Sequence, residues 1–119
     1  MPNCGVHRVT VLLVAPVVGF DATIAPTLFG SAADASGAPL YEVTICAATA
    51  GAVPTTSGYS MLPGAGPQAL ATADTVVIPG TRYPPARTNG TLGPEVRAAL
   101  EMVRPGARLV SICTGAFVL

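Results

Sequence analysis

The sequence predicts an α/β fold, a three-layer sandwich built on a mainly parallel sheet. Its apolar residues gather in short, nearly continuous runs, which is typical of strands buried on both faces of a parallel sheet. Helical patterns separate these runs, and such alternation places helices on both faces of the sheet. The expected strands are residues 8–15, 41–47, 74–79 and 108–112. The expected helices lie near residues 21–35 and 94–104.

Glycine and proline divide the first part of the chain. After the first strand, Asp21 is a favourable N-cap for the first helix. Pro26 lies inside that helix and predicts a late start or a kink. Residues 36–39, SGAP, end the helix before the second strand.

The middle of the chain predicts smaller elements. The runs Val53–Thr56 and Tyr59–Leu62 flank Ser57-Gly58 and indicate a hairpin. A short helical turn is expected around Gln68–Ala71, and the strand DTVVIP ends at Gly80. Pro94 suits the first position of the second helix.

A long loop, Thr81–Gly90, follows the third strand and would overhang the carboxyl ends of the strands. Its Arg82, Tyr83 and Arg87 could receive a carboxylate or a phosphate. A solvated surface loop is the favoured interpretation of these three residues.

Composition excludes several classes of protein. The 119 residues suffice for one domain, expected to run from residue 8 to 119 after a flexible tail at 1–7. Six basic and six acidic residues give no net charge, so this segment is not expected to bind nucleic acid by itself. No apolar run reaches 18 residues, and residues 9–20 lack a convincing cleavage site. We therefore expect a cytoplasmic protein without a membrane span.

Three cysteines stand at positions without the C-x-x-C spacing of metal or redox sites. An odd number argues against a disulfide framework, and neither a metal nor a cofactor is predicted. Cys46 is expected in the core, and Cys4 in the tail. Cys113 comes directly after the last strand and before Thr114-Gly115.

Two interpretations of Cys113 are open on spacing alone. It is either a buried free cysteine, which is common in cores, or a nucleophile held at the end of a strand. In the second case Gly115 allows a tight turn. Free N–H groups at the start of the following helix would favour a thiolate.

The segment VSICTGAFVL, residues 110–119, resembles the nucleophile elbow of the ThiJ/PfpI superfamily. The likeness is greatest to the N-terminal domain of GlxA-type AraC family transcriptional regulators. Supporting stretches are HRVTVLLVAPVVGFD (7–21), PLYEVTICA (39–47), TTSGYSMLP (55–63), ADTVVIPG (73–80) and PEVRAAL (94–100). The resemblance implies a class I glutamine amidotransferase-like, flavodoxin-like fold, which is incomplete at the C-terminus.

The resemblance also assigns roles to individual residues. Cys113 takes the position of the elbow cysteine, and Gly80 begins the loop whose backbone N–H faces it. Thr114 supplies a second backbone donor, and Thr81 replaces a glycine often found after Gly80. Together with Asp21 and Thr27, described below, these residues form the expected ligand-binding rim.

The sequence departs from the superfamily pattern in three ways: Thr81 in place of a glycine, which leaves the backbone donor in place, and two departures that weaken the case for an enzyme. Enzymes of the superfamily place a carboxylate beside the cysteine, and Thr27 appears at the position we match to it. Asp21 is interpreted as a helix cap rather than as a catalytic acid. His7 is the only histidine and belongs to the opposite rim of the sheet. The family's own histidine lies beyond the elbow, and we interpret the chain as truncated after it.

Two functions follow as expectations. The favoured one is a ligand-sensing and dimerisation domain, a fragment of a GlxA-like AraC-type regulator, without catalytic turnover. Its partners would be an unidentified small-molecule effector and further copies of itself, and the DNA-binding domain would lie downstream in full-length relatives. The alternative is a fragment of a cysteine-dependent ThiJ/PfpI enzyme of amidase, hydratase or deglycase type. The apolar tail Ala116–Leu119 is expected to be exposed and to drive association.

Overall fold

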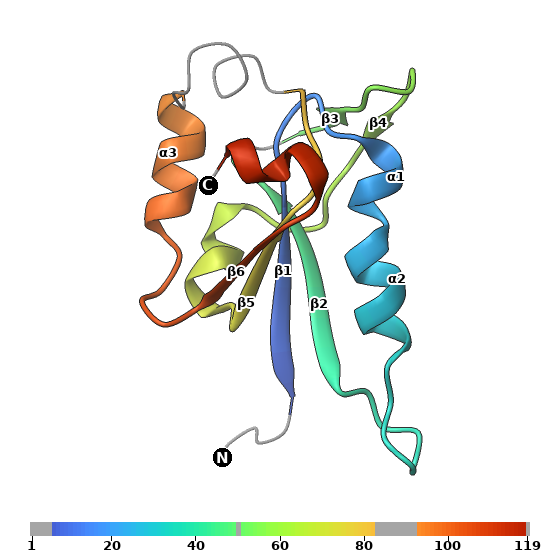
Figure 1. Ribbon diagram of the computed structural model, residues 1–119. Coiled ribbons are helices and arrows are strands. Elements are labelled where there is room, and N and C mark those ends of the chain that lie inside the picture. Colours follow the sequence, from blue (N-terminus) through green and yellow to red (C-terminus); the bar gives the residue numbers. More distant parts are fainter. Residues whose placement is uncertain (1–5, 50, 83–92, 119) are drawn as a thin grey trace.

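A single parallel sheet forms the centre of the molecule, with strand order β2-β1-β5-β6 (Figure 1). The computed structural model describes residues 6–49, 51–82 and 93–118. The predicted mainly parallel sheet is therefore confirmed. Its strands are β1 (His7–Leu13), β2 (Tyr41–Ala47), β5 (Thr75–Ile78) and β6 (Arg108–Ser111).

Strand β1 divides the core into two halves because its side chains alternate between the two faces of the sheet. Val9, Val11 and Leu13 pack on one face with Ala22 and Ala25. The other face is formed around Leu12, Val14, Val76, Ile78 and Val96. Both sets are almost completely buried, which explains why the strand is a continuous apolar run rather than an alternating one.

Two layers of helix cover the sheet. Helices α1 (Gly19–Ala22) and α2 (Ile24–Ser31) lie beside β2, and α3 (Pro94–Glu101) lies at the other side of the molecule (Figure 1). The short 3-10 helix η1 (Pro67–Thr72) packs with α3, as the expected helical turn at 68–71 indicated. The hairpin is also confirmed, with β3 (Val53–Pro54) antiparallel to β4 (Ser60–Met61).

The expected N-cap at Asp21 is wrong, whereas the late start or kink expected from Pro26 agrees with two separate helices in place of one over 21–35. The chain enters the helix at Gly19, and the N-cap residue is Val18. A break follows at Thr23, whose N–H and hydroxyl both donate to the carbonyl of Phe20, at 3.2 and 2.8 Å. Pro26 then falls in the first turn of α2, where its missing N–H costs no helical hydrogen bond.

The ends of the domain also differ from expectation. Strand β1 begins at His7, one residue before the expected start at residue 8, and Cys4 lies outside the described residues. Val118 is only 2% exposed and packs in the half of the core that contains Ile78 and Val96. The expectation of an exposed apolar tail is therefore wrong at Val118. The reason is that α3 offers this residue an apolar surface.

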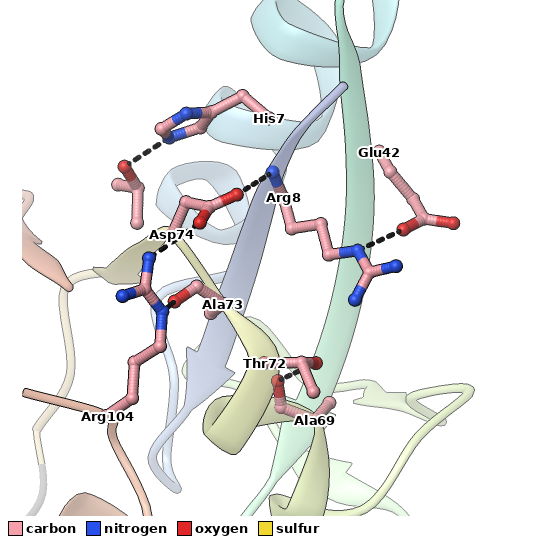
Figure 2. A network of polar contacts seen from close by, with 9 residues as sticks. His7, Arg8, Glu42, Ala69, Thr72, Ala73, Asp74 and Arg104 are labelled. Carbon is pink, nitrogen blue, oxygen red and sulfur yellow. Dashed lines mark hydrogen bonds and ion pairs between the residues drawn. The ribbon is translucent and has the colours of Figure 1, made fainter. Parts of the chain in front are cut away.

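A polar network fixes the amino ends of the strands (Figure 2). The carboxylate of Asp74 accepts the backbone N–H of Arg8 at 2.9 Å and the Arg104 guanidinium at 2.6 Å. Arg104 also donates to the carbonyl of Ala73 at 3.0 Å. One carboxylate thereby connects the start of β1, the start of β5 and the segment after α3.

Asp74 should make acid stability pH-dependent. The Arg8 N–H and then the Arg104 guanidinium hold the pKa of this carboxyl below its ordinary value of 3.8. Its stabilising effect is therefore complete above that value and is lost as the pH falls through the lowered folded pKa. We expect Asp74→Asn to lower the melting temperature at neutral pH, and the difference from the native chain to shrink in acid.

Thermal denaturation followed by circular dichroism across this pH range checks the prediction. Glu101→Gln removes an exposed carboxylate of α3 and serves as the control. A deficit of the Asp74→Asn variant that stayed constant into strong acid would contradict the assignment.

Candidate functional site

Cys113 has the backbone geometry of an elbow. It follows β6 after one residue, opens the 3-10 helix η3 (Cys113–Phe117) and has a φ of 53°. A positive φ at a residue other than glycine is costly and persists only where the surroundings enforce it. Cys113 is also exposed, so the interpretation of this residue as a buried core cysteine is wrong.

Gly115 allows the elbow to press against the end of β5. A Cβ atom on Gly115 would collide with the carbonyl oxygen of Ile78 and would lie 2.7 Å from that of Pro79. Two backbone hydrogen bonds hold the chain at this contact. The N–H of Ile112 donates to the Ile78 carbonyl at 2.9 Å, and the N–H of Gly115 donates to the Ile112 carbonyl at 2.9 Å. Close backbone packing, rather than an unusual φ, is what requires glycine here.

Two threonines join the elbow to the loop after β5. The N–H of Thr81 donates to Thr114 Oγ1 at 3.0 Å, and the Thr114 hydroxyl donates to the Thr81 carbonyl at 2.9 Å. We call this reciprocal pair the clasp. The Thr81 hydroxyl is buried and lies 2.6 Å from the Val14 carbonyl and 3.0 Å from that of Pro16. The clasp therefore ties the elbow to the end of β1 as well.

The segment after β1 is held between two others. The N–H of Val18 donates to the Gly80 carbonyl at 2.8 Å, and that of Arg82 donates to the Pro16 carbonyl at 3.0 Å. On the hairpin side, the N–H of Val17 donates to the Pro54 carbonyl at 3.0 Å. These bonds bring the start of α1 to the carboxyl ends of β5 and β6.

Asp21 is placed by this arrangement at the elbow. A Cβ atom on Gly80 would collide with the Asp21 carboxylate and would lie 3.3 Å from Thr114 Oγ1. The Asp21 carboxylate and the Thr114 hydroxyl therefore both lie close to Gly80, and Thr114 directly follows Cys113 in the chain. Asp21 was expected both at this rim and as a helix N-cap. The structure places it at the rim, whereas the N-cap residue is Val18.

The other residues singled out from the sequence lie apart from this cluster. Thr27 is exposed on α2, in a hollow with Phe20, Thr23, Ile24 and Leu28. His7 begins β1 at the opposite rim, where its Nε2 lies 2.8 Å from Thr75 Oγ1. The structure therefore unites Gly80, Thr81, Thr114 and Asp21 next to Cys113, and it leaves out Thr27.

Of the three residues expected to overhang the site, Arg82 is described. Its side chain is exposed, while its backbone N–H donates to the Pro16 carbonyl. Tyr83 and Arg87 lie outside the described residues.

A cavity of about 170 Å³ opens beside the clasp. It lies at the carboxyl ends of β1 and β2 and is lined by Val14, Ala48, Val53, Val96 and the carboxylate-bearing Glu95, among others. Val14 connects the cavity to the clasp, because it lines the cavity and its carbonyl accepts the Thr81 hydroxyl. The cavity is smaller than the roughly 300 Å³ at which pockets for drug-sized ligands begin, so it suits a small metabolite.

Among residues 6–49, 51–82 and 93–118, no group of three or more His, Cys, Asp or Glu side chains is placed to hold a metal ion. Within the same described residues, every helix is too short or too polar to cross a bilayer.

Comparison with known proteins identifies the fold. No family model and no curated protein matches the sequence. An AraC family transcriptional regulator from Pseudomonas putida has a TM-score of 0.66 at 19% identity, over 94% of this chain and 58% of that one. A ThiJ/PfpI family protein from Pseudomonas syringae has a TM-score of 0.71 at 19% identity, over 100% and 51%. A DJ-1 superfamily protein from Agrobacterium tumefaciens has a TM-score of 0.60 at 22% identity, over 92% and 55%.

The fold is therefore the flavodoxin-like α/β fold of ThiJ/PfpI and DJ-1 proteins, which the Pseudomonas putida AraC family regulator also contains. This agrees with the family resemblance noted in the sequence. The chain spans between 51% and 58% of the length of these three structures.

Selective alkylation tests the contrast between the two described cysteines. Burial raises the pKa of the Cys46 thiol to about 12, and this side chain is fully enclosed, whereas Cys113 is exposed. In the native chain at neutral pH, iodoacetamide should modify Cys113 and leave Cys46 intact until the protein unfolds. Peptide mass spectrometry with and without denaturant measures this, and Cys113→Ser identifies the modified position. Equal modification of both thiols in the folded chain would contradict the placement.

Gly115→Ala tests the contact between the elbow and β5. The new methyl group would strike backbone atoms, which cannot rotate away, so we expect a loss of about 1–3 kcal/mol of unfolding free energy. Gly64→Ala is the matched control, since a Cβ there has no neighbour within 4 Å. Denaturant unfolding of both variants provides the comparison, and equal stability of the two would refute the close packing.

Proposed function

We propose that the chain is a ligand-sensing and dimerisation domain of a GlxA-like AraC-type transcriptional regulator, acting in the cytoplasm without catalytic turnover. Support comes from the fold shared with an AraC family regulator and from the elbow geometry of Cys113. In this proposal an effector binds in the cavity beside the elbow rim, and the fold transmits its presence to the regulator's other parts.

The observation that carries the absence of turnover is the clasp. Acyl transfer and related reactions need backbone N–H groups that point at a developing oxyanion. Here the N–H of Thr81 donates to Thr114 Oγ1 instead. A backbone N–H of the loop after β5, which a catalytic elbow would direct at the oxyanion, is therefore already engaged in a hydrogen bond within the protein. Because these hydrogen bonds join the loop to the elbow, the rim is better suited to rigid binding than to a reaction.

The cavity beside the clasp is the proposed effector site. Its walls are mostly aliphatic, and Glu95 adds one carboxylate. This composition suits a small, partly apolar molecule that carries a hydrogen-bond donor or a positive charge. Because Val14 lines the cavity and also accepts the Thr81 hydroxyl, an occupant would contact the strand end to which the elbow is tied.

A cysteine-dependent enzyme is the second candidate, and one observation favours it. The Asp21 carboxylate meets Gly80 beside Thr114, so the rim does hold a group able to accept and return a proton. A carboxylate is therefore present at this rim, although Thr27 lies apart from it. The case gains no support from a histidine, because the single histidine of the sequence is His7, which lies at the other rim.

Turnover assays separate the two candidates. Amide hydrolysis, glyoxal hydration and deglycation should all proceed at the uncatalysed rate with the native chain, and Cys113→Ser and Asp21→Asn should change nothing. Product formation that both substitutions abolish would overturn the sensor proposal and establish the enzyme.

Binding is tested separately by thermal shift with a panel of amino acids and small amines. We expect at least one probe to raise the melting temperature of the native chain and of Glu101→Gln. The same probe should lose its effect on Glu95→Gln, which alters the cavity. An effect that Glu95→Gln left unchanged would argue against the cavity as the effector site.

A further inference from the structure

A second cavity, of about 490 Å³, lies at the amino ends of the strands, at the opposite rim of the sheet from the elbow. It is larger than the cavity beside the clasp, and its volume falls within the roughly 300–1,000 Å³ of pockets that hold small molecules. Ligands of open α/β sheets normally bind at the carboxyl ends of the strands, so this position is a separate one. We call this cavity the amino-rim pocket and define it by five of the residues that line it: His7, Phe29, Tyr41, Thr75 and Arg108.

The sheet itself forms one side of the amino-rim pocket. Each of the four strands contributes its first residue, in the order Tyr41, His7, Thr75 and Arg108 across the sheet. The register pairs His7 with Tyr41 and Thr75 with Arg108. Thr75 also pairs with Val9, which lies two residues after His7 and therefore shares its face of the sheet. All four side chains thus belong to the same face.

Three rings and one hydroxyl hold one another in place on this face. The Tyr41 ring meets the His7 ring edge to face, with 5.7 Å between the ring centroids. It meets the Phe29 ring of α2 in the same way at 4.7 Å. His7 Nε2 lies 2.8 Å from the hydroxyl oxygen of Thr75, which is buried. A surface that is already ordered loses little conformational freedom when a ligand binds, so the rings are suited to contact a flat molecule.

Arg108 gives the amino-rim pocket a positive charge without a counter-ion. Within the part of the chain that the structure describes, its guanidinium makes no hydrogen bond or ion pair, and no Asp or Glu lines the pocket. Two carboxylates adjoin these residues in the sequence, and both are already engaged. Asp74 accepts the Arg104 guanidinium and the Arg8 N–H, and Glu42 pairs with the Arg8 guanidinium at 3.2 Å (Figure 2). An unpaired guanidinium beside aromatic rings favours a ligand that carries an anion.

We propose that the amino-rim pocket binds a small aromatic carboxylate. The carboxylate accepts hydrogen bonds from the Arg108 guanidinium, and the flat apolar part packs against the rings of His7 and Tyr41. Arg108 and His7 begin strands that are two positions apart in the sheet, which is roughly 10 Å at the usual strand spacing. A ligand of about two fused rings therefore reaches both ends, whereas acetate or phosphate reaches only Arg108.

This inference goes beyond the proposed function and does not rest on it. The amino-rim pocket and the proposed effector cavity share no lining residue and lie at opposite rims of the sheet. Binding at one can therefore be measured and abolished without the other.

Isothermal titration calorimetry with matched probes tests the proposal. The probes are 2-naphthoate, the neutral 2-naphthamide of the same shape, and inorganic phosphate. The native chain should bind 2-naphthoate at least about tenfold more tightly than either of the other two, because only this probe uses both the guanidinium and the rings. Arg108→Gln should reduce the affinity for 2-naphthoate to that for 2-naphthamide and leave the amide unaffected.

A second variant and two controls make the result specific. Thr75→Val keeps the shape of the side chain but removes the hydroxyl that positions the His7 ring, so it should weaken both naphthyl probes by about threefold or more. Arg97→Gln removes an exposed cation of α3, and Glu95→Gln alters the effector cavity. Both controls should bind 2-naphthoate like the native chain. Circular dichroism verifies that all four variants fold.

Several results would overturn the proposal. A native chain that does not bind 2-naphthoate, or that binds it no better than 2-naphthamide or phosphate, would refute it without any variant. Binding that Glu95→Gln abolishes and Arg108→Gln leaves unchanged would place the probe in the effector cavity instead. Amide NMR signals of His7 and Arg108 that broaden with protein concentration, and that 2-naphthoate does not shift, would assign the pocket to a contact between copies. Failure of every effector probe, with Arg108-dependent binding of 2-naphthoate intact, would refute the effector cavity and leave this inference standing.

Discussion

The clasp between Thr81 and Thr114 is the contact on which the arrangement of the rim depends. One threonine follows β5 and the other lies in the elbow, and two hydrogen bonds of 3.0 and 2.9 Å join them. The Thr81 hydroxyl extends the connection to the carbonyls of Val14 and Pro16 at the end of β1. A buried hydroxyl that is satisfied in this way is costly to disturb, so three strand ends are fixed relative to one another.

The positive φ of Cys113 and the two glycines of the site are explained by the same constraint. Gly115 lets the elbow approach the carbonyls of β5, and Gly80 leaves room for the Asp21 carboxylate. With both neighbours fixed, Cys113 is held in a conformation that an unconstrained chain would avoid. The rim thus combines an exposed thiol, a carboxylate and a hydroxyl in a rigid setting, while one backbone donor is already engaged. That balance is the basis on which we propose binding rather than turnover.

The sequence predicted the sheet and most of the residues of the rim, but not the contacts that hold the rim together. The strands follow from apolar runs, and the hairpin follows from Ser57-Gly58, because both are encoded within a few residues. The first helix breaks at Thr23, where the Thr23 hydroxyl donates to a backbone carbonyl. The N-cap preferences of the sequence do not indicate the position of this break. Asp21 reaches the elbow only because Val18 bonds to Gly80, far away in the sequence. Burial of Val118 likewise depends on α3, so periodicity near the C-terminus gave no signal for it.

Hydrogen exchange at the Thr81 amide tests the role of the clasp most directly. Thr114→Val keeps the shape of the side chain and removes the hydroxyl, whereas Thr114→Ser keeps the hydroxyl. Site-resolved exchange by NMR should show a protected Thr81 amide in the native chain and in Thr114→Ser, with exchange at least about tenfold faster in Thr114→Val because a bond acceptor is lost. Equal protection in all three proteins would contradict the account, since the rim would then be fixed without the clasp.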